Sequence, residues 1–330
     1  MSAEASRAAA PTSAASLLRL LLKQDVLLIL IGFVILASLV SPTFLTPNNL
    51  TNLLSQSALL GILATAQFLV VVCGGFDLSV AAVMALCSLV FASNVGVGVA
   101  PAAVMALATG GACGLFNGLV ITKGRVQPLI ATLAMMGIAR SLALSISEKS
   151  ILVRDPVVAA IRGFSWIVSV PTMVWFAVIL VGAVWFATSR QALHVYAVGG
   201  NEQTARLAGV RVDRIKIGVY TASGLLSGLA GLALVMRASS GSPLGGNGWE
   251  LDTIAAIVIG GTNLFGGEGK LLRAMMGVVI YQMIANIMNL TRIDPFYQDI
   301  VRACVIVAAG ALGVLRQRHA DRRVLQRRPA

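Results

Sequence analysis

The chain has 330 residues, of which 57% are hydrophobic and 12% are charged, whereas soluble domains carry roughly 25% charged residues. Its mean hydropathy of +0.87 excludes an ordinary soluble fold and predicts an all-α polytopic membrane protein. The formal net charge of +12 does not indicate a nucleic-acid partner, because the basic residues lie between apolar runs and at the C-terminus. Membrane topology and lipid headgroups explain that pattern better.

Taken in chain order, the apolar segments predict about ten transmembrane helices. Residues 1–16 are rich in Ala and Ser, which predicts a disordered N-terminus, and the run 26–40 predicts an uncleaved first span. A helix needs about 20 residues to cross the hydrocarbon. The predicted spans form one membrane domain, 17–315, and are 17–41, 51–72, 79–96, 99–121, 127–146, 171–189, 214–236, 251–264, 269–290 and 298–315.

The distribution of Lys and Arg predicts that both termini lie in the cytoplasm. In that orientation the inner segments collect most of the basic residues, including the island 190–216 and the basic tail 316–330. A shift of five spans reverses orientation, so spans two to five and seven to ten are compatible with an inverted repeat. The similarity of segments 77–82 and 252–256 is the sequence support for this repeat.

A polar loop at 190–213 interrupts the apolar sequence between spans six and seven. The pair Gly199-Gly200 predicts the end of one helix, Asn201 predicts the cap of the next, and Gly209 predicts its end about two turns later. A short, capped, water-exposed helix on the cytoplasmic side suits a docking element on which another protein acts. This loop favours a coupled transporter over a membrane enzyme.

Three amides share one face of the ninth span: Gln282, Asn286 and Asn289, at positions i, i+4 and i+7. Unpaired amides are costly in hydrocarbon, so this face must meet other polar groups or water. Interhelical hydrogen bonding is one interpretation. The other is a wet pathway for an uncharged polyol or sugar, and no intramembrane chain of Lys, Asp or His indicates ion coupling.

Small-residue faces and outer arginines complete the pattern. Gly110-x-x-x-Gly114-x-x-x-Gly118 and Gly224-x-x-x-Gly228 predict close helix approach, within the chain rather than at a dimer seam.

Arg237 and Arg292 fall on the outer side, which the positive-inside rule leaves poor in basic residues. They are candidates for docking an acidic partner, the alternative being ordinary solvated or headgroup-facing side chains.

Catalytic and metal-binding patterns are absent from the sequence. The four cysteines have no CxxC spacing, which predicts packing roles and no metal site, and the two histidines have no nucleophile–base arrangement. The segment 266–270 resembles a phosphate loop but lacks the Ser or Thr after Lys270, so it fails the Walker A pattern. We therefore expect no cofactor in this chain, and any ATP and Mg²⁺ to be bound by partner subunits.

Several motifs occur together in the order typical of one family. They are Gly74–Val80, Gly118–Arg125 leading into Ile130–Leu133, Tyr196–Glu202, Ala205–Gly209, and Trp249–Ala256 leading into Gly260–Gly267. From about residue 25 to 315, the chain resembles ribose-type ABC transporter permeases, the membrane subunits of bacterial binding-protein-dependent sugar importers. Two departures are Leu193-His194 before the Tyr-Ala stretch and the segment 147–170, which lacks the usual glycine-rich turn.

The resemblance implies a set of partners and contacts. It implies two cytoplasmic ATPase subunits, a periplasmic sugar-binding protein, a second permease copy in a homodimer and a location in the bacterial inner membrane. The docking arginines would then face the binding protein, and Asn286 and Asn289 match a pathway stretch. The residues carried over as ATPase contacts are Asn201, Glu202, Ala205, Arg206, Leu207 and Gly209.

The sequence thus predicts a permease for a monosaccharide or similar polyol, driven by ATP hydrolysis on partner subunits, and not an enzyme itself. A nucleoside, an autoinducer sugar or a branched-chain amino acid are alternative cargoes for the same fold. A secondary transporter is a further alternative, against which the missing intramembrane charges speak. The identity of the sugar does not follow from the sequence.

Overall fold

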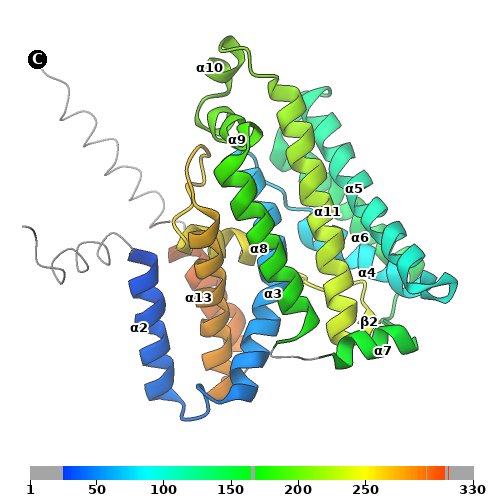
Figure 1. The fold of residues 1–330 in the computed structure, drawn as a ribbon, viewed down its shortest axis with the longest axis vertical. Coiled ribbons are helices and arrows are strands. Elements are labelled where there is room, and N and C mark those ends of the chain that lie inside the picture. Colours follow the sequence, from blue (N-terminus) through cyan, green and yellow to red (C-terminus); the bar gives the residue numbers. More distant parts are fainter. Residues whose placement is uncertain (1–24, 165–167, 295, 309–310, 312–330) are drawn as a thin grey trace, which may run out of the picture.

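The computed structural model describes residues 25–164, 168–294, 296–308 and 311, and within them the fold is all-α, as predicted (Figure 1). Two short strands, β1 (Ile151–Leu152) and β2 (Ser240–Gly241), pair antiparallel. The helices are α2 (Asp25–Val40), α3 (Pro47–Val72), α4 (Val80–Asn94), η1 (Val95–Val97), α5 (Val99–Thr122), α6 (Pro128–Ile146), α7 (Pro156–Gly163), α8 (Val170–Thr188), α9 (Arg190–Gly200), α10 (Glu202–Leu207), α11 (Val212–Ala238), α12 (Trp249–Ile259) and α13 (Leu271–Leu290).

Seven helical segments in the described part of the chain are long and apolar enough to cross a membrane: α3, α4 with η1, α5, α6, α8, α11 and α13. They coincide with seven of the ten predicted spans. The other three are shorter there: α2 has 16 residues, α12 has 11, and the last helical stretch covers 296–308. The count of ten spans is therefore not confirmed. The predicted N-terminus, 1–16, and the tail, 316–330, lie outside the described residues.

Helix α12 is short because glycines bound it at both ends. It begins after Gly248, which has φ +85°, and ends at Gly260. A Cβ on Gly260 would lie 2.4 Å from the carbonyl oxygen of Arg273, so only glycine lets the end of α12 touch the start of α13. The chain then reverses through a glycine-rich loop, in which Gly261, Gly266, Gly267 and Gly269 have positive φ angles.

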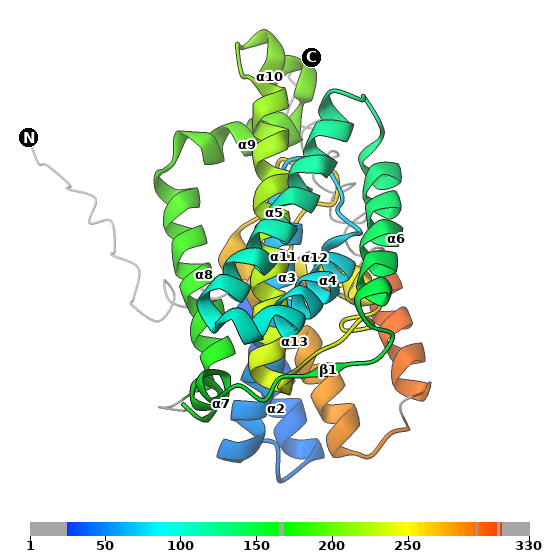
Figure 2. The same cartoon turned by 90° about the vertical axis from the view of Figure 1, so that its right-hand side faces the viewer.

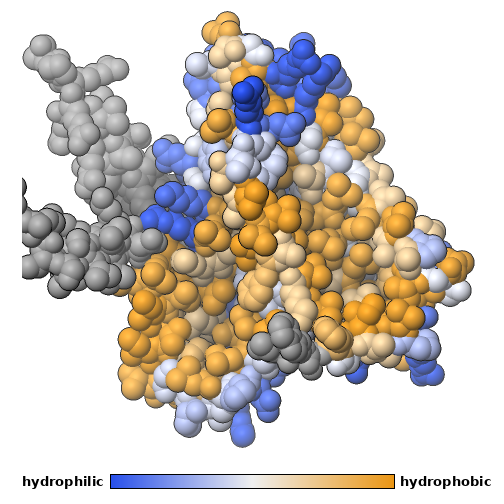
Figure 3. Space-filling view, in the orientation of Figure 1, coloured by the Kyte–Doolittle hydropathy of each residue, from blue (hydrophilic) through white to orange (hydrophobic). Residues whose placement is uncertain are grey.

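Helix α3 is the central element of the fold. Most of its length is buried, and it contacts α11, α13, α8 and α12 (Figure 1). The outer helices α5, α6 and α8 instead have only 33%, 28% and 17% of their apolar windows buried inside the protein. Figure 3 shows the resulting apolar band between polar ends. Such a band is typical of a surface that faces lipid.

Two of these helices cross at backbone contact through the glycine faces. A Cβ on Gly114 would lie 2.2 Å from the carbonyl oxygen of Tyr220, and one on Gly224 would lie 2.1 Å from that of Gly110. Both glycine faces are therefore buried in the contact between α5 and α11 of the same chain. The prediction of packing within the chain is confirmed for these helices.

The two halves of the chain have matching arrangements. Figure 1 shows α3 and α11 running in opposite directions. Helix α3 contacts α12 and α13, and in the same way α11 contacts α4 and α5. Exchanging α3, α4 and α5 for α11, α12 and α13 thus preserves these contacts, which agrees with the predicted inverted repeat.

The two ends of the bundle differ in character. At one end α10 projects beyond the membrane helices, with α9 next to it, and toward the other end lie α7 and β1 (Figure 2). In the β1–β2 pair Ile151 is opposite Gly241, and Asp155 caps α7 by accepting hydrogen bonds from the backbone of Val157 and Val158. These features tie the segment after α6 to the loop after α11.

The glycine crossing gives a direct stability test. We expect Gly224→Ala to lower the unfolding temperature strongly, because the new methyl group would force α5 and α11 apart. Gly218→Ala on the same helix is the matched control, since a Cβ there has no neighbour within 4 Å. That control should be neutral or stabilising. Thermal unfolding in detergent measures both, and equal stability of the two variants would contradict the crossing.

Candidate functional site

The segment between α8 and α11 folds as two short helices in succession. Ser189 caps α9 by accepting a hydrogen bond from the backbone of Gln191, at 3.1 Å. Asn201 caps α10 by accepting one from the backbone of Thr204, at 2.9 Å. Helix α10 ends before Gly209, which has φ +83°. The predicted cap, length and end of the second helix are confirmed.

The double glycine also ends the first helix, as predicted, since α9 stops at Gly200 and Asn201 is its extended C-cap. Both glycines lie in the last turn of α9, which continues to Gly200. The reason for glycine is close packing, since a Cβ on Gly199 would lie 1.8 Å from the carbonyl oxygen of Val72 and 2.7 Å from the backbone nitrogen of Gly267. The end of α9 is thus pressed against the end of α3.

A loop from the second half of the chain completes this junction. The backbone N–H of Gly267 donates to the carbonyl of Val72 at 3.0 Å, and the Tyr196 hydroxyl donates to the carbonyl of Gly269 at 2.8 Å. Gly74 and Gly266 have positive φ angles and touch one another. The base of the short helices is therefore fixed to both halves of the membrane domain.

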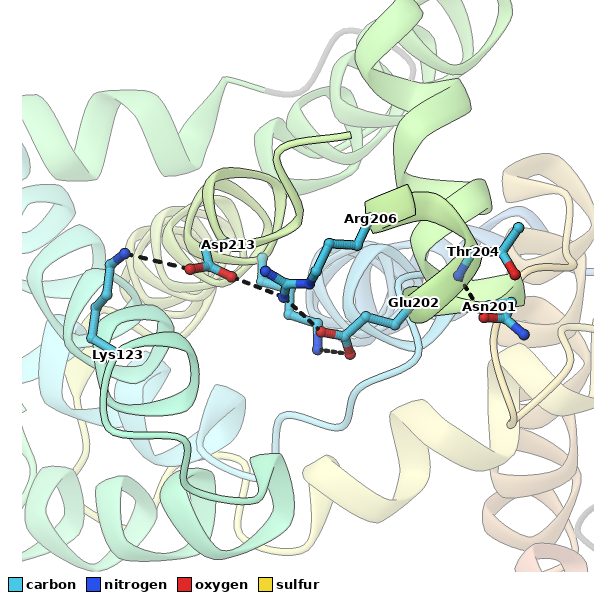
Figure 4. A network of polar contacts seen from close by, with 7 residues as sticks. Lys123, Asn201, Glu202, Thr204, Arg206 and Asp213 are labelled. Atoms are coloured by element: carbon cyan, nitrogen blue, oxygen red, sulfur yellow. Dashed lines mark hydrogen bonds and ion pairs between the residues drawn. The ribbon is translucent and has the colours of Figure 1, made fainter. Parts of the chain in front are cut away.

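An ion-pair network holds α10 over the start of α11 (Figure 4). Lys216 donates to Glu202 at 2.6 Å, and Arg206 donates to Glu202 and to Asp213, each at 3.2 Å. Lys123, at the end of α5, reaches the other oxygen of Asp213 at 3.4 Å. The hydrogen bond from Lys216 holds the pKa of Glu202 below its usual range, and the hydrogen bond to Asp213 raises the pKa of Arg206.

The predicted ATPase contacts take different positions on α10. Ala205 is buried and packs with the core, so it anchors the helix. Leu207 is 90% exposed, an apolar side chain presented to solvent at the tip of the protein. Glu202 and Arg206 are partly exposed and pair with each other, and Asn201 and Gly209 shape the helix ends. The outward surface of α10 thus centres on Leu207 rather than on Ala205.

The structure divides the three predicted pathway amides. Asn286 is buried and exchanges two hydrogen bonds with Asn49 of α3, at 2.8 and 3.1 Å, which fits the interhelical interpretation. Gln282 and Asn289 instead line a small polar cavity. Asn289 also accepts a hydrogen bond from Gln298 at 3.0 Å.

The predicted docking arginines both lie at the end opposite α10. Arg237 is in the last turn of α11 and lines the same cavity as Gln282. Arg292 follows α13, is exposed, and has φ +57°. The sequence interpretation missed that Asp252, Tyr281 and Gln56 meet Arg237 there. No local signal brings these residues together, since they come from four helices.

Comparison of the sequence with known proteins defines the class of protein to which this chain belongs. Residues 49–310 match the family described as the permease component of branched-chain amino acid transport systems, and the chain belongs to this family. It is therefore a multi-pass membrane permease component and not an enzyme.

Its relatives are more specific than the family description. The ribose import permease protein of Escherichia coli (strain K12) is 40% identical over 298 residues, covering 88% of this chain and 92% of that protein. The Bacillus subtilis (strain 168) ribose import permease protein is 38% identical over 84% of this chain and 88% of its own length. The L-arabinose transport system permease protein of E. coli (strain K12) is 35% identical, covering 93% and 95%. No solved structure gives a significant match.

The network on α10 predicts an acid-dependent stability. Because the pKa of Glu202 is lowered from its ordinary 4.5, its contribution is complete above that value and is lost as the pH falls through the lowered pKa. We expect Glu202→Gln to lower the unfolding temperature slightly near neutral pH. The free energy of unfolding should fall by less than about 1 kcal/mol, because the ion pair is partly exposed. The difference from wild type should shrink as the pH falls below 4.5 and vanish once the pH is below the lowered pKa of Glu202.

Glu148→Gln, an exposed carboxylate outside the network, is the control and should behave like wild type throughout. Thermal unfolding in detergent across this pH range makes the measurement. A difference between Glu202→Gln and wild type that persists at low pH would contradict the ionic origin of the effect.

Proposed function

We propose that the chain forms the membrane pathway of an importer for a monosaccharide or similar polyol, driven by ATP hydrolysis on separate subunits. The observation that carries the proposal is the capped, ion-paired helix α10, which projects beyond the membrane helices and is fixed to α3 at the glycine junction. The relatives are import or transport permeases named for ribose, allose and arabinose. Because all three relatives are named for a pentose or a hexose, they support a sugar as the cargo.

The proposed partners follow from the two ends of the bundle. Cytoplasmic ATPase subunits, which hold ATP and Mg²⁺, dock on α10, so this end of the bundle faces the cytoplasm. The distribution of Lys and Arg supports a cytoplasmic location for both chain termini as well. A periplasmic binding protein docks at the opposite end, where Arg292 is exposed. A second permease copy, most simply an identical one, and membrane lipid surround the pathway.

One other cargo is favoured by a specific observation. The family description names branched-chain amino acids, which would make the cargo zwitterionic rather than a neutral polyol. Uptake by the reconstituted importer distinguishes the two, with radiolabelled D-ribose, D-allose and L-arabinose tested against L-leucine. If the importer transports leucine but none of the sugars, the cargo is an amino acid and the proposed sugar cargo is wrong.

The coupling role of α10 has its own test. Replacing Glu202 and Arg206 together with Ala removes three of the ion pairs that hold α10. We expect sugar uptake to fall at least about tenfold while ATP hydrolysis continues, because the helix no longer transmits motion as a rigid body. The measurement is uptake per ATP hydrolysed in proteoliposomes that contain the complete importer.

The matched control removes one carboxylate and one guanidinium from the other end of the bundle, Glu148→Ala with Arg154→Ala, both exposed. It should leave the uptake-to-hydrolysis ratio unchanged. Normal coupling in the Glu202/Arg206 variant, with the complex still assembled, would sink the proposed role.

Docking at the opposite end depends on charge. We expect Arg292→Glu to weaken binding-protein stimulation of ATP hydrolysis at low salt, and the loss to shrink as salt rises and screens the native attraction. Arg292→Lys retains the charge and should retain most of the stimulation. The measurement is stimulated minus basal ATPase activity across a salt series. If charge reversal leaves stimulation intact at low salt, Arg292 is an ordinary solvated side chain.

A further inference from the structure

A polar cavity of about 80 Å³ lies among α3, α11, α12, α13 and the last helical stretch, toward the end of the bundle opposite α10. Amide, acidic, basic and aromatic side chains converge on it from these five segments. Those that matter here are Gln56, Arg237, Trp249, Asp252, Tyr281 and Arg302. The amides Gln282 and Asn289 complete its polar wall.

The charges around this cavity balance. Asp252 is buried and accepts a hydrogen bond from the Tyr281 hydroxyl, and Arg302 pairs with Asp299 at 3.5 Å. Arg237 makes no hydrogen bond or ion pair with any other residue that the structure describes. The cavity wall thus carries two guanidinium groups and the carboxylate of Asp252, and Asp299 neutralises Arg302 from outside the wall. A neutral guest fits such a site better than a cation or an anion does.

The wall also has the chemistry that recognises hydroxyl groups. The carboxylate of Asp252 accepts hydrogen bonds, the guanidinium of Arg237 donates them, and the amide of Gln56 does both. Trp249 adds an apolar aromatic surface beside them. A neutral polyol presents both kinds of surface, because each hydroxyl donates and accepts while the C–H face of the ring is apolar.

The face of α3 that borders the cavity carries a second polar group deeper in the protein. Gln56 and Leu60 line the cavity, and Gln67 lies on the same helical face, seven residues beyond Leu60. Seven residues place it about 10 Å further along α3 toward the α9–α10 end. Gln67 therefore continues the line of the cavity toward the opposite side of the membrane domain.

Gln67 has no hydrogen-bond partner among the residues that the structure describes. Its side chain is 0% exposed, and neither its amide nitrogen nor its amide oxygen finds a hydrogen bond among the described residues. A buried amide without hydrogen bonds destabilises the fold, and in native proteins nearly all buried polar groups are hydrogen-bonded. A buried amide with a structural role has a hydrogen-bond partner in the fold, as Asn286 has in Asn49. Gln67 lacks one, so we expect its partner to be a molecule that enters the protein.

We propose that the α3 face from Gln56 to Gln67, with Asp252 opposite its outer end, is a track of hydroxyl-binding sites for the neutral polyol being transported. This proposal rests on the proposed function and assigns its substrate contacts. The cavity holds only about two or three waters in the present conformation. A sugar ring therefore requires separation of α3 from α12 and α13, and its hydroxyls would replace that water and satisfy Gln67.

The decisive experiment compares stability with transport in the complete importer. Gln67→Leu should keep or raise the unfolding temperature, because it removes an unpaired amide, and should lower D-ribose uptake by about tenfold or more through the lost contact. Asn286→Leu is the stability control and should lower the unfolding temperature, since it strands Asn49. Gln56→Leu and Asp252→Asn should also reduce uptake.

A transport control lies on another face of α3. Thr65 borders a separate apolar cavity and its hydroxyl already donates to the carbonyl of Gly61 at 2.8 Å, so Thr65→Val should leave uptake unchanged. If Gln67→Leu unfolds as readily as Asn286→Leu, the amide is structural and the proposal is wrong. Unchanged uptake by Gln67→Leu overturns it equally.

Cysteine labelling tests the track even if the cargo is not a sugar. With the four native cysteines replaced by Ala, Gln56→Cys and Gln67→Cys should react with a small aqueous thiol reagent during ATP turnover. Ile62→Cys, on another face of α3 and fully buried, should not react. Failure of wild type to carry any sugar overturns the proposed function, and failure of both positions to react overturns the track.

Discussion

Backbone contact at glycines is the constraint on which the rest of this structure depends. It sets the α5–α11 crossing, where Gly114 and Gly224 leave no room for a side chain, and it joins α9 to α3 at Gly199. Apolar burial cannot hold membrane helices together as it does in water, because lipid is equally apolar. Close van der Waals contact between backbones takes its place, and a rigid joint follows from it.

That joint gives the exposed helix α10 a mechanical connection to the interior. Helix α10 is tied to α11 by the ion pairs of Glu202 and Asp213, and α9 is pressed onto the end of α3. A force on Leu207 would therefore reach α3 and α11 together. These are the two long helices that correspond in the two halves, so motion of α10 would move one half against the other.

The sequence predicts local features well and long-range ones poorly. The seven long spans, the Asn201 cap and the end at Gly209 follow from hydropathy and capping, which depend on neighbouring residues. The pairing of Asn286 with Asn49 joins positions 237 residues apart, and nothing in the sequence of α13 specifies it. The close packing of Gly199 does not follow from the sequence for the same reason, because its contacts lie in α3 and the loop before α13.

The amides show why partners, rather than residue types, separate scaffold from pathway. Asn286 and Gln67 look alike in the sequence, and both are buried in membrane helices. Asn286 has its hydrogen bonds met by Asn49 in the closed fold, so its polarity stabilises helix packing. Gln67 costs stability in the same fold. A group of that kind lowers the energy difference between the closed fold and a conformation that admits a polar guest, because only the second satisfies it.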